Sequence, residues 1–182
     1  MARKTLYMLR RTNRVLAILI GMVLLWCAGA VLLDIVLRRL GSSFGGTDEI
    51  AGYVMAVVSA WGMGFAMLEL AHVRIDVLRS RATPIGRSLL DLTAMFALSS
   101  TITVIAIYCW PVVETSIANS SRANTPLETD LILVQIPWFA GWLWFVAMAW
   151  LTFAAALALV LQGRYAESES VIGAFAEQEP AR

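Results

Sequence analysis

Charge is scarce in this sequence, and so are the residues on which most soluble chemistry depends. Only 15% of its 182 residues are charged and 59% are hydrophobic, with one histidine and two cysteines. Soluble domains carry about one quarter charged residues. The shortage of charge excludes a disordered chain and a nucleic-acid binder with a basic face, and two cysteines exclude a disulfide scaffold. We therefore expect the chain to be surrounded mainly by lipid.

Catalytic and cofactor motifs are also missing from the sequence. It contains no Cys-x-x-Cys, no glycine-rich phosphate loop, no His-Glu-x-x-His and no Gly-x-Ser-x-Gly. A haem held between two histidines of this chain is excluded, because His72 is the only histidine. We expect no enzyme activity, no metal and no cofactor. Cys27 and Cys109 are expected to be lipid-buried thiols, although the sequence also allows a disulfide between them.

Four stretches without any charge are long enough to cross a bilayer: 15–33, 50–68, 92–113 and 131–161. A hydrocarbon core about 30 Å thick requires roughly 20 apolar residues in a helix, and runs this long must satisfy their backbone hydrogen bonds internally. The sequence predicts an all-α integral membrane protein with four transmembrane helices and short interfacial segments, with spans at about 15–37, 50–71, 90–113 and 137–161. Ala28-Gly29-Ala30 resembles a signal-peptidase site, but the apolar run continues beyond it, so we expect the first helix to be retained.

Basic residues on the predicted loops orient these helices. Nine lie in the N-terminal tail and in the loop between the second and third spans, whereas three lie on the opposite side. This bias predicts that both termini are cytoplasmic. We divide the chain into a basic cytoplasmic segment (1–14), a four-helix membrane domain (15–162) and an acidic cytoplasmic tail (163–182), which we expect to be a mobile end.

Small residues recur at every fourth position of the second span, at Gly52, Ala56, Ala60 and Gly64. Such a row allows the backbone of another helix to approach closely in lipid. The row would serve packing within the chain or packing on a separate subunit, and the sequence leaves both open. Trp61 lies on the same helix and belongs to this candidate partner-packing surface.

A polar stripe follows the second span, where Glu69, His72 and Asp76 are spaced i, i+3 and i+7. Glu-x-x-His is half of a carboxylate-bridged two-metal motif in helix bundles. A complete site needs two copies, and the single histidine excludes the second. We expect an interfacial polar network in which the stripe pairs with Arg74 and Arg79.

Acidic residues also mark the opposite end of the first two spans. Asp48 and Glu49 open the second span, where a carboxylate favours the positive end of a helix by about 0.3–1 kcal/mol. Asp34 and Arg38 form a favourable i, i+4 helix pair. Ionisable residues within a membrane usually mark transport pathways, and none falls inside the four uncharged stretches. The chain alone is therefore expected to be neither a proton-coupled pump nor a channel for charged substrates.

The fourth uncharged stretch is longer than a straight crossing requires. Pro137 lies near its start, so we expect the part before it to run along the membrane interface or to form a kinked start to the helix. Four tryptophans fall in this stretch, at Trp138, Trp142, Trp144 and Trp150. We interpret most of them as anchors in an aromatic belt; the alternative is an aromatic ligand-binding cluster.

The order of several short motifs is typical of one family. They are Asp34-Ile35-Val36-Leu37-Arg38, Asp48-Glu49-Ile50-Ala51, then Trp61, Gly64 and Ala66, then His72-Val73-Arg74-Ile75-Asp76, Thr125-Pro126 and Ile136-Pro137-Trp138. This order resembles the small membrane subunit of TRAP transporters, the tripartite ATP-independent periplasmic carriers, over roughly residues 10–162. The His-x-x-x-Asp segment after an acidic-opened helix is the most specific part. Gly46-Thr47 departs from the family, which often has an aromatic residue there.

The resemblance implies a small non-catalytic subunit of a sodium-coupled, ATP-independent uptake transporter for an organic acid, in the bacterial inner membrane. In that family a large permease subunit carries the substrate and sodium sites and moves by an elevator-like motion, while a periplasmic substrate-binding protein delivers the solute. The small subunit packs beside the permease as a scaffold among membrane lipids, with a further role in docking the binding protein. Two alternatives stay open: a membrane anchor of a respiratory, quinone-linked complex, and a small membrane enzyme using the stripe at Glu69.

Overall fold

The computed structural model describes residues 2–70 and 81–172, and these residues are helical apart from their connections. The helices are α1 (Ala2–Arg39), α2 (Thr47–Leu68), α3 (Pro84–Asn119), α4 (Ile132–Leu161) and α5 (Tyr165–Ile172). In the described part of the chain, extended pairing is limited to one isolated bridge between Arg122 and Asp130. The first four helices are long and apolar enough to cross a membrane. The prediction of an all-α protein with four candidate spans is therefore confirmed.

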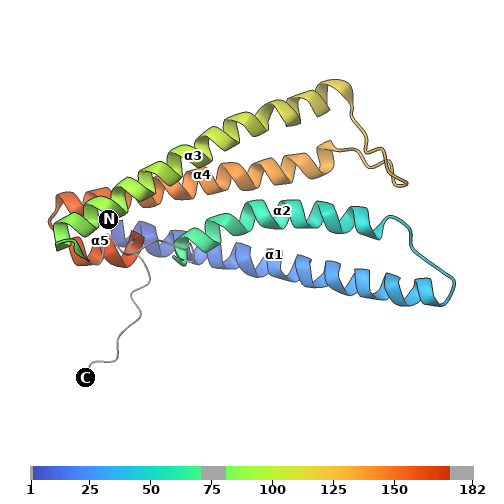
Figure 1. Ribbon diagram of the computed structural model, residues 1–182, viewed down its shortest axis with the longest axis horizontal. Coiled ribbons are helices and arrows are strands. Elements are labelled where there is room, and N and C mark those ends of the chain that lie inside the picture. Colours follow the sequence, from blue (N-terminus) through green and yellow to red (C-terminus); the bar gives the residue numbers. More distant parts are fainter. Residues whose placement is uncertain (1, 71–80, 173–182) are drawn as a thin grey trace.

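The four long helices form two hairpins, α1–α2 and α3–α4. Figure 1 shows them meeting near the N-terminus and α5 and diverging toward the two connecting loops. We call these two extremities the tail end and the loop end, the loop end being residues 40–46 and 120–131. Most contacts join α1 to α2, α2 to α4 and α4 to α3, so the helices stand in a row in that order, and a smaller set of contacts joins α1 directly to α4.

Local chemistry sets the helix ends. Thr83 precedes α3, and its hydroxyl accepts a hydrogen bond from the backbone N–H of Gly86 at 3.3 Å, with Pro84 in the first helical position. Both are preferred at a helix start. Gly41 follows α1 with a φ of +84°, the left-handed conformation that commonly stops a helix.

The best-packed part of the molecule lies between α3 and α4. Buried residues of α3 recur at alternating spacings of four and three, at Ser88, Leu92, Met95, Ser99, Ile102 and Ala106. Those of α4 follow the same rule, at Gly141, Phe145, Met148, Thr152, Ala155 and Leu159. This spacing places one face of each helix continuously against its neighbour. Small side chains such as Ser99 and Ala156, both 0% exposed, allow a close approach.

Residues 165–172 correct the expectation that the whole acidic tail is a mobile end. They form α5, which packs on α3 and α4. Ser168, Val171 and Ile172 are buried, and Arg10 of α1 donates a hydrogen bond to the carbonyl of Ser170 at 3.3 Å. The acidic residues make the segment look polar in the sequence, although it forms a short amphipathic helix with one apolar face. Residues 173–182 lie outside the described residues.

Pro137 lies inside the last long helix, close to its start. The helix α4 begins at Ile132 and continues through Pro137 to Leu161. A proline removes one backbone hydrogen bond, and here it does so near the start of the helix, where few intrahelical bonds depend on it. The structure shows α4 as one continuous helix, and both expectations for the part before Pro137, a run along the interface and a kinked start, stay predictions.

Candidate functional site

The row of small residues on α2 is divided between two environments. Ala60 is 2% exposed and Gly64 is also buried, whereas a Cβ on Gly52 would have no atom within 4 Å. On α4, a Cβ at Gly141 would lie 2.9 Å from the Cβ of Ala60 and 2.8 Å from Cδ1 of Trp61. The tail-end half of the row therefore packs within the chain, against α4. Gly52 faces open space, and Ala56 is half-buried.

Hydrogen bonds from tryptophan indole N–H groups connect the long helices to one another. Trp61 of α2 donates to the carbonyl of Pro137 at 2.9 Å, and its ring stacks on Trp144 with centroids 6.2 Å apart. Trp144 in turn donates to Oδ1 of Asn13 at 3.2 Å. This chain of contacts ties α1, α2 and α4 together. Asn13, which is 1% exposed, was not singled out by the sequence reasoning, and its position just before an uncharged stretch was the available signal.

Two of the α4 tryptophans make contacts within the bundle that the expectation of an aromatic belt did not include. Trp144 binds Asn13, and Trp150 donates to Oγ1 of Thr103 on α3 at 2.9 Å. An indole N–H within lipid requires an acceptor from the protein, so these side chains turn inward. Trp138 and Trp142 are half-buried, and their anchoring role stays a prediction.

Asp34 organises the loop between α1 and α2. Its carboxylate is 1% exposed and accepts hydrogen bonds from Nε of Arg38 at 2.8 Å, from Oγ of Ser43 at 3.1 Å and from the backbone N–H of Phe44 at 2.9 Å. The predicted pair with Arg38 is present, but it is one part of a larger arrangement. Arg38 also meets the exposed carboxylate of Asp48 at 3.3 Å.

Glu49 connects the start of α2 to the other loop. Oη of Tyr53 donates to Oε1 of Glu49 at 2.6 Å, and the carboxylate also interacts with Thr125 and Thr129 of the α3–α4 loop. Leu127 of that loop occupies the place that a side chain on Gly46 would fill. The role of Glu49 therefore includes a contact between loops, beyond the expected interaction with the helix end.

The predicted stripe at the end of α2 lies mostly outside the described residues. Glu69 follows the last turn of α2 and is half-buried, but His72, Arg74 and Asp76 fall in the undescribed segment. A buried carboxylate that the sequence reasoning missed, Asp91 of α3, is 3% exposed. Within residues 2–70 and 81–172 there is no group of three His, Cys, Asp or Glu side chains that could hold a metal ion.

The cysteines are unpaired. Cys27 lies on α1 and Cys109 on α3, the two outermost helices of the row. The disulfide that the sequence allowed is therefore absent, and both thiols are partly exposed on the helix surfaces.

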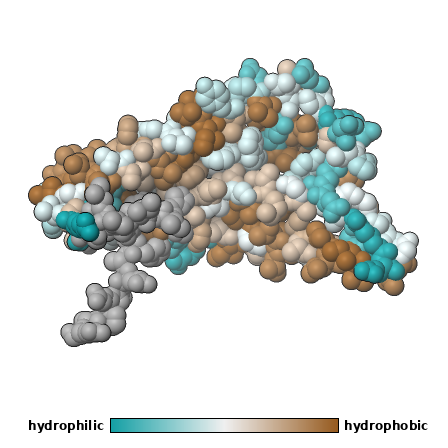
Figure 2. All heavy atoms as spheres, in the orientation of Figure 1, coloured by the Kyte–Doolittle hydropathy of each residue, from teal (hydrophilic) through white to brown (hydrophobic). Residues whose placement is uncertain are grey.

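The most exposed apolar face belongs to α1. None of the residues in its most apolar stretch is buried, against 39% in the corresponding stretch of α4. Trp26, in the middle of α1, is 83% exposed. Apolar residues cover much of the face seen in Figure 2, and hydrophilic residues gather mainly toward the loop end.

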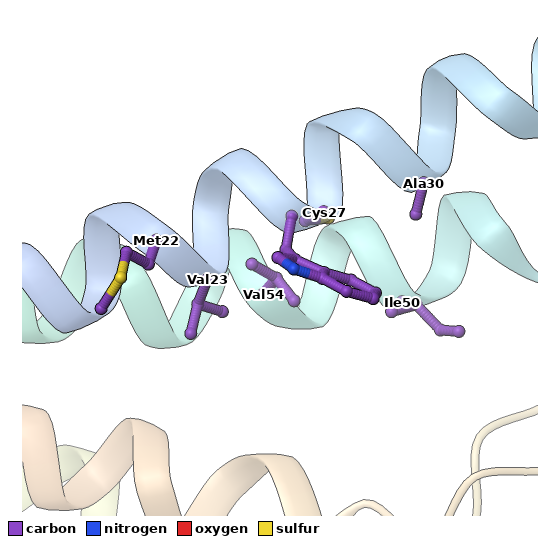
Figure 3. Close-up of a pocket in the computed structure, with 7 residues that line it drawn as sticks. Met22, Val23, Cys27, Ala30, Ile50 and Val54 are labelled. Atoms are coloured by element: carbon purple, nitrogen blue, oxygen red, sulfur yellow. The ribbon is translucent and has the colours of Figure 1, made fainter.

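Two shallow apolar grooves adjoin Trp26. One, of about 360 Å³, is lined by Met22, Val23, Trp26, Cys27, Ala30, Ile50 and Val54. In Figure 3 the labelled side chains of α1 and α2 border one space beside the hairpin. The second groove, of about 490 Å³, is lined by Leu25, Trp26, Gly29, Ala30, Leu33 and Phe44. No charged side chain lines either groove, so both suit apolar neighbours.

Comparison with known proteins identifies the family. The model of the DctQ component of tripartite ATP-independent periplasmic transporters matches residues 27–163, from the middle of α1 to just beyond α4. None of the curated proteins and none of the solved structures compared with the chain matches it. The match confirms the resemblance carried by the sequence motifs. The chain belongs to the DctQ family, the small membrane component of the TRAP transporters.

Proposed function

We propose that the chain is the stationary, non-catalytic membrane subunit of a sodium-coupled TRAP transporter that takes up an organic acid across the bacterial inner membrane. It packs beside the large permease, and the periplasmic binding protein docks at its loop end. The observation that carries this proposal is the unpartnered apolar face of α1, on a chain that belongs to a transporter-component family. The respiratory-anchor alternative depended on His72, and the family match does not favour it.

The packing of the bundle supports a stationary role. The α3–α4 faces are filled by side chains at regular spacing, and the indole bonds of Trp61 and Trp144 join three of the four long helices. An elevator-like permease requires a neighbour that does not move with it. A closely packed row of hydrogen-bonded helices meets that requirement, because interfaces of small residues pack tightly in lipid.

We place the permease-binding surface on α1 around Trp26. The earlier candidate, the row on α2, is weakened as a partner surface because Ala60 and Gly64 already contact α4. Tryptophan prefers the membrane interface to the membrane centre, yet Trp26 lies near the middle of the candidate span Met8–Arg39 and is 83% exposed. A protein neighbour would cover its ring and supply an acceptor for its N–H. Gly29, with open space around it, would allow that neighbour to come close.

Co-purification with the permease in mild detergent tests this assignment. Trp26→Ala and Gly29→Leu should each reduce the recovered permease about tenfold or more, since a central tryptophan contributes about 2 kcal/mol or more at a binding interface. Tyr108→Ala is the matched control, because Tyr108 is an aromatic residue 75% exposed on α3. Full recovery with both α1 variants would overturn the assignment of this surface.

Uptake in liposomes tests the proposed function itself. The chain alone should move no organic acid under a sodium gradient, whereas addition of the permease and the binding protein should produce uptake. Transport by the isolated chain would contradict the stationary role. Two results together would support both the surface on α1 and the proposed function: the α1 variants fail to bind the permease, and the unaltered complex shows normal uptake.

A further inference from the structure

Each hairpin has an uncharged stretch between its charged residues, which we call its uncharged belt. The uncharged belts of the two hairpins lie at different levels along the bundle. The contacts between α2 and α4 fix their relative position: Gly141 meets Ala60, and Gly64 meets Phe145. Both helices run from the loop end to the tail end, so Glu69, at the end of α2, lies level with about Trp150 in the middle of α4.

The remaining helices can be placed on the same scale. Gly62 of α2 faces Ile20 of α1, and Gly64 faces Asn13. Since α1 runs opposite to α2, Arg14 of α1 lies level with residues 63–68 of α2, on the loop-end side of Glu69. Three contacts align α3 with α4: Trp150 with Thr103, Phe96 with Phe153, and Trp110 with Phe139. Asp91 of α3 is therefore level with the last turn of α4.

The charged residues that limit each belt show the displacement. At the tail end, Asp91 lies roughly 15 Å beyond the level of Glu69, at 1.5 Å per helical residue, and Arg14 does not reach further toward the tail end than Glu69. At the loop end, Glu114 of α3 lies roughly 10 Å further toward the tail end than Glu49 of α2.

We propose that the row of helices stands inclined in the bilayer, by roughly 30° from the membrane normal, so that one flat layer of hydrocarbon covers the belts of both hairpins. The angle follows from a displacement of roughly 12 Å between hairpins whose centres are two helix spacings of roughly 9 Å apart. It lies within the range seen for membrane helices. The lipid-facing surface is then an oblique band that rises from α3 to α1.

The inclination explains the length of the uncharged stretch of α4. This helix stands between α2 and α3, so its apolar residues must match the belt of α2 at the loop end and the belt of α3 at the tail end. One crossing of ordinary length would match only one of them. The inference concerns lipid alone and holds whether or not a permease is bound.

Spin labels on the full chain in liposomes test the depth order, in a Cys27→Ser/Cys109→Ser background. Val15→Cys on α1 and Leu151→Cys on α4 mark exposed positions, and Leu151 is the nearer of the two to the tail end. In an upright bundle, Leu151 would lie closer to water than Val15. In an inclined bundle the order of depth reverses. The spin label at Val15 then responds more strongly to a water-soluble nickel reagent, and the label at Leu151 responds more strongly to dissolved oxygen.

Polarised infrared spectroscopy of aligned bilayers measures the inclination directly. The mean helix tilt should be roughly 30°, and the unaltered chain is used. A mean tilt below about 15°, or a label at Val15 deeper than the label at Leu151, would overturn the proposal. Melting curves that match the unaltered protein would show that the labelled variants keep the fold.

Discussion

At the residue scale, the tightest point of the bundle is Gly141. A single hydrogen on its α-carbon lets α4 lie against Ala60 and the ring of Trp61, at distances that a Cβ could not share. This contact brings the indole of Trp61 to the carbonyl of Pro137. Gly52 has the same side chain on α2, but nothing lies near it. Close helix packing therefore requires a glycine at Gly141 but not at Gly52.

Gly141→Ala should lower the free energy of unfolding by about 1–3 kcal/mol, because the added methyl group forces α2 and α4 apart. Gly52→Ala is the matched control, and it should leave stability unchanged or raise it by up to about 1 kcal/mol through better helix propensity. Thermal unfolding in detergent, followed by tryptophan fluorescence, measures both. Equal melting temperatures for the two variants would contradict the packing described for Gly141.

A second residue-scale prediction concerns Asp34, whose carboxylate receives three hydrogen bonds from Arg38, Ser43 and Phe44. Asp34→Ala removes these acceptors, and hydrogen bonds to a charged group contribute about 1.5–3 kcal/mol each. The amide of Phe44 should exchange its hydrogen at least about tenfold faster. Asp48→Ala removes the other partner of Arg38, but Asp48 is 83% exposed, so exchange at Phe44 should stay unchanged. Nuclear magnetic resonance would resolve this amide.

At the element scale, the sequence predicted which segments are helices better than it predicted what they touch. Length and the absence of charge were sufficient for the four candidate spans, because lipid leaves few alternatives. The row of small residues on α2 could not reveal its partner, since such a row suits any closely approaching helix. The inward turn of Trp144 and Trp150 was missed for a related reason: it depends on Asn13 and Thr103, which lie far away in the chain.

The helix α5 offers an element-scale prediction. Ile172 is 1% exposed and belongs to the main apolar cluster with residues of α3 and α4. Ile172→Asp should destabilise the tail end by about 2 kcal/mol or more, because it places a charge among apolar side chains. Ser170→Asp is the control, since Ser170 is exposed on the same helix. Limited proteolysis should cut the Ile172 variant faster within residues 163–172, and equal rates for both variants would show that α5 is not held by this contact.

At the scale of the whole molecule, four crossings by the four candidate spans would place both ends of the membrane domain on one side of the bilayer. The basic residues of the N-terminal tail and of the loop between the second and third spans favour the cytoplasm for that side. The loop end, with its acidic groups at Asp34, Asp48 and Glu49, would then face the periplasm, where a binding protein is able to reach it. The proposed docking role requires this orientation.

Cysteine labelling of intact cells tests the orientation, in a chain whose own two cysteines are replaced by serine. Asn124→Cys lies exposed in the α3–α4 loop and Ala166→Cys lies exposed on α5. A maleimide that cannot cross the membrane should label position 124 directly and position 166 only after the membrane is opened. The two sites are matched in exposure, so a difference in labelling reports the side of the membrane rather than burial. The reverse pattern would place the loop end in the cytoplasm, and labelling of both positions in intact cells would mean that the two ends of the bundle are not separated by the bilayer.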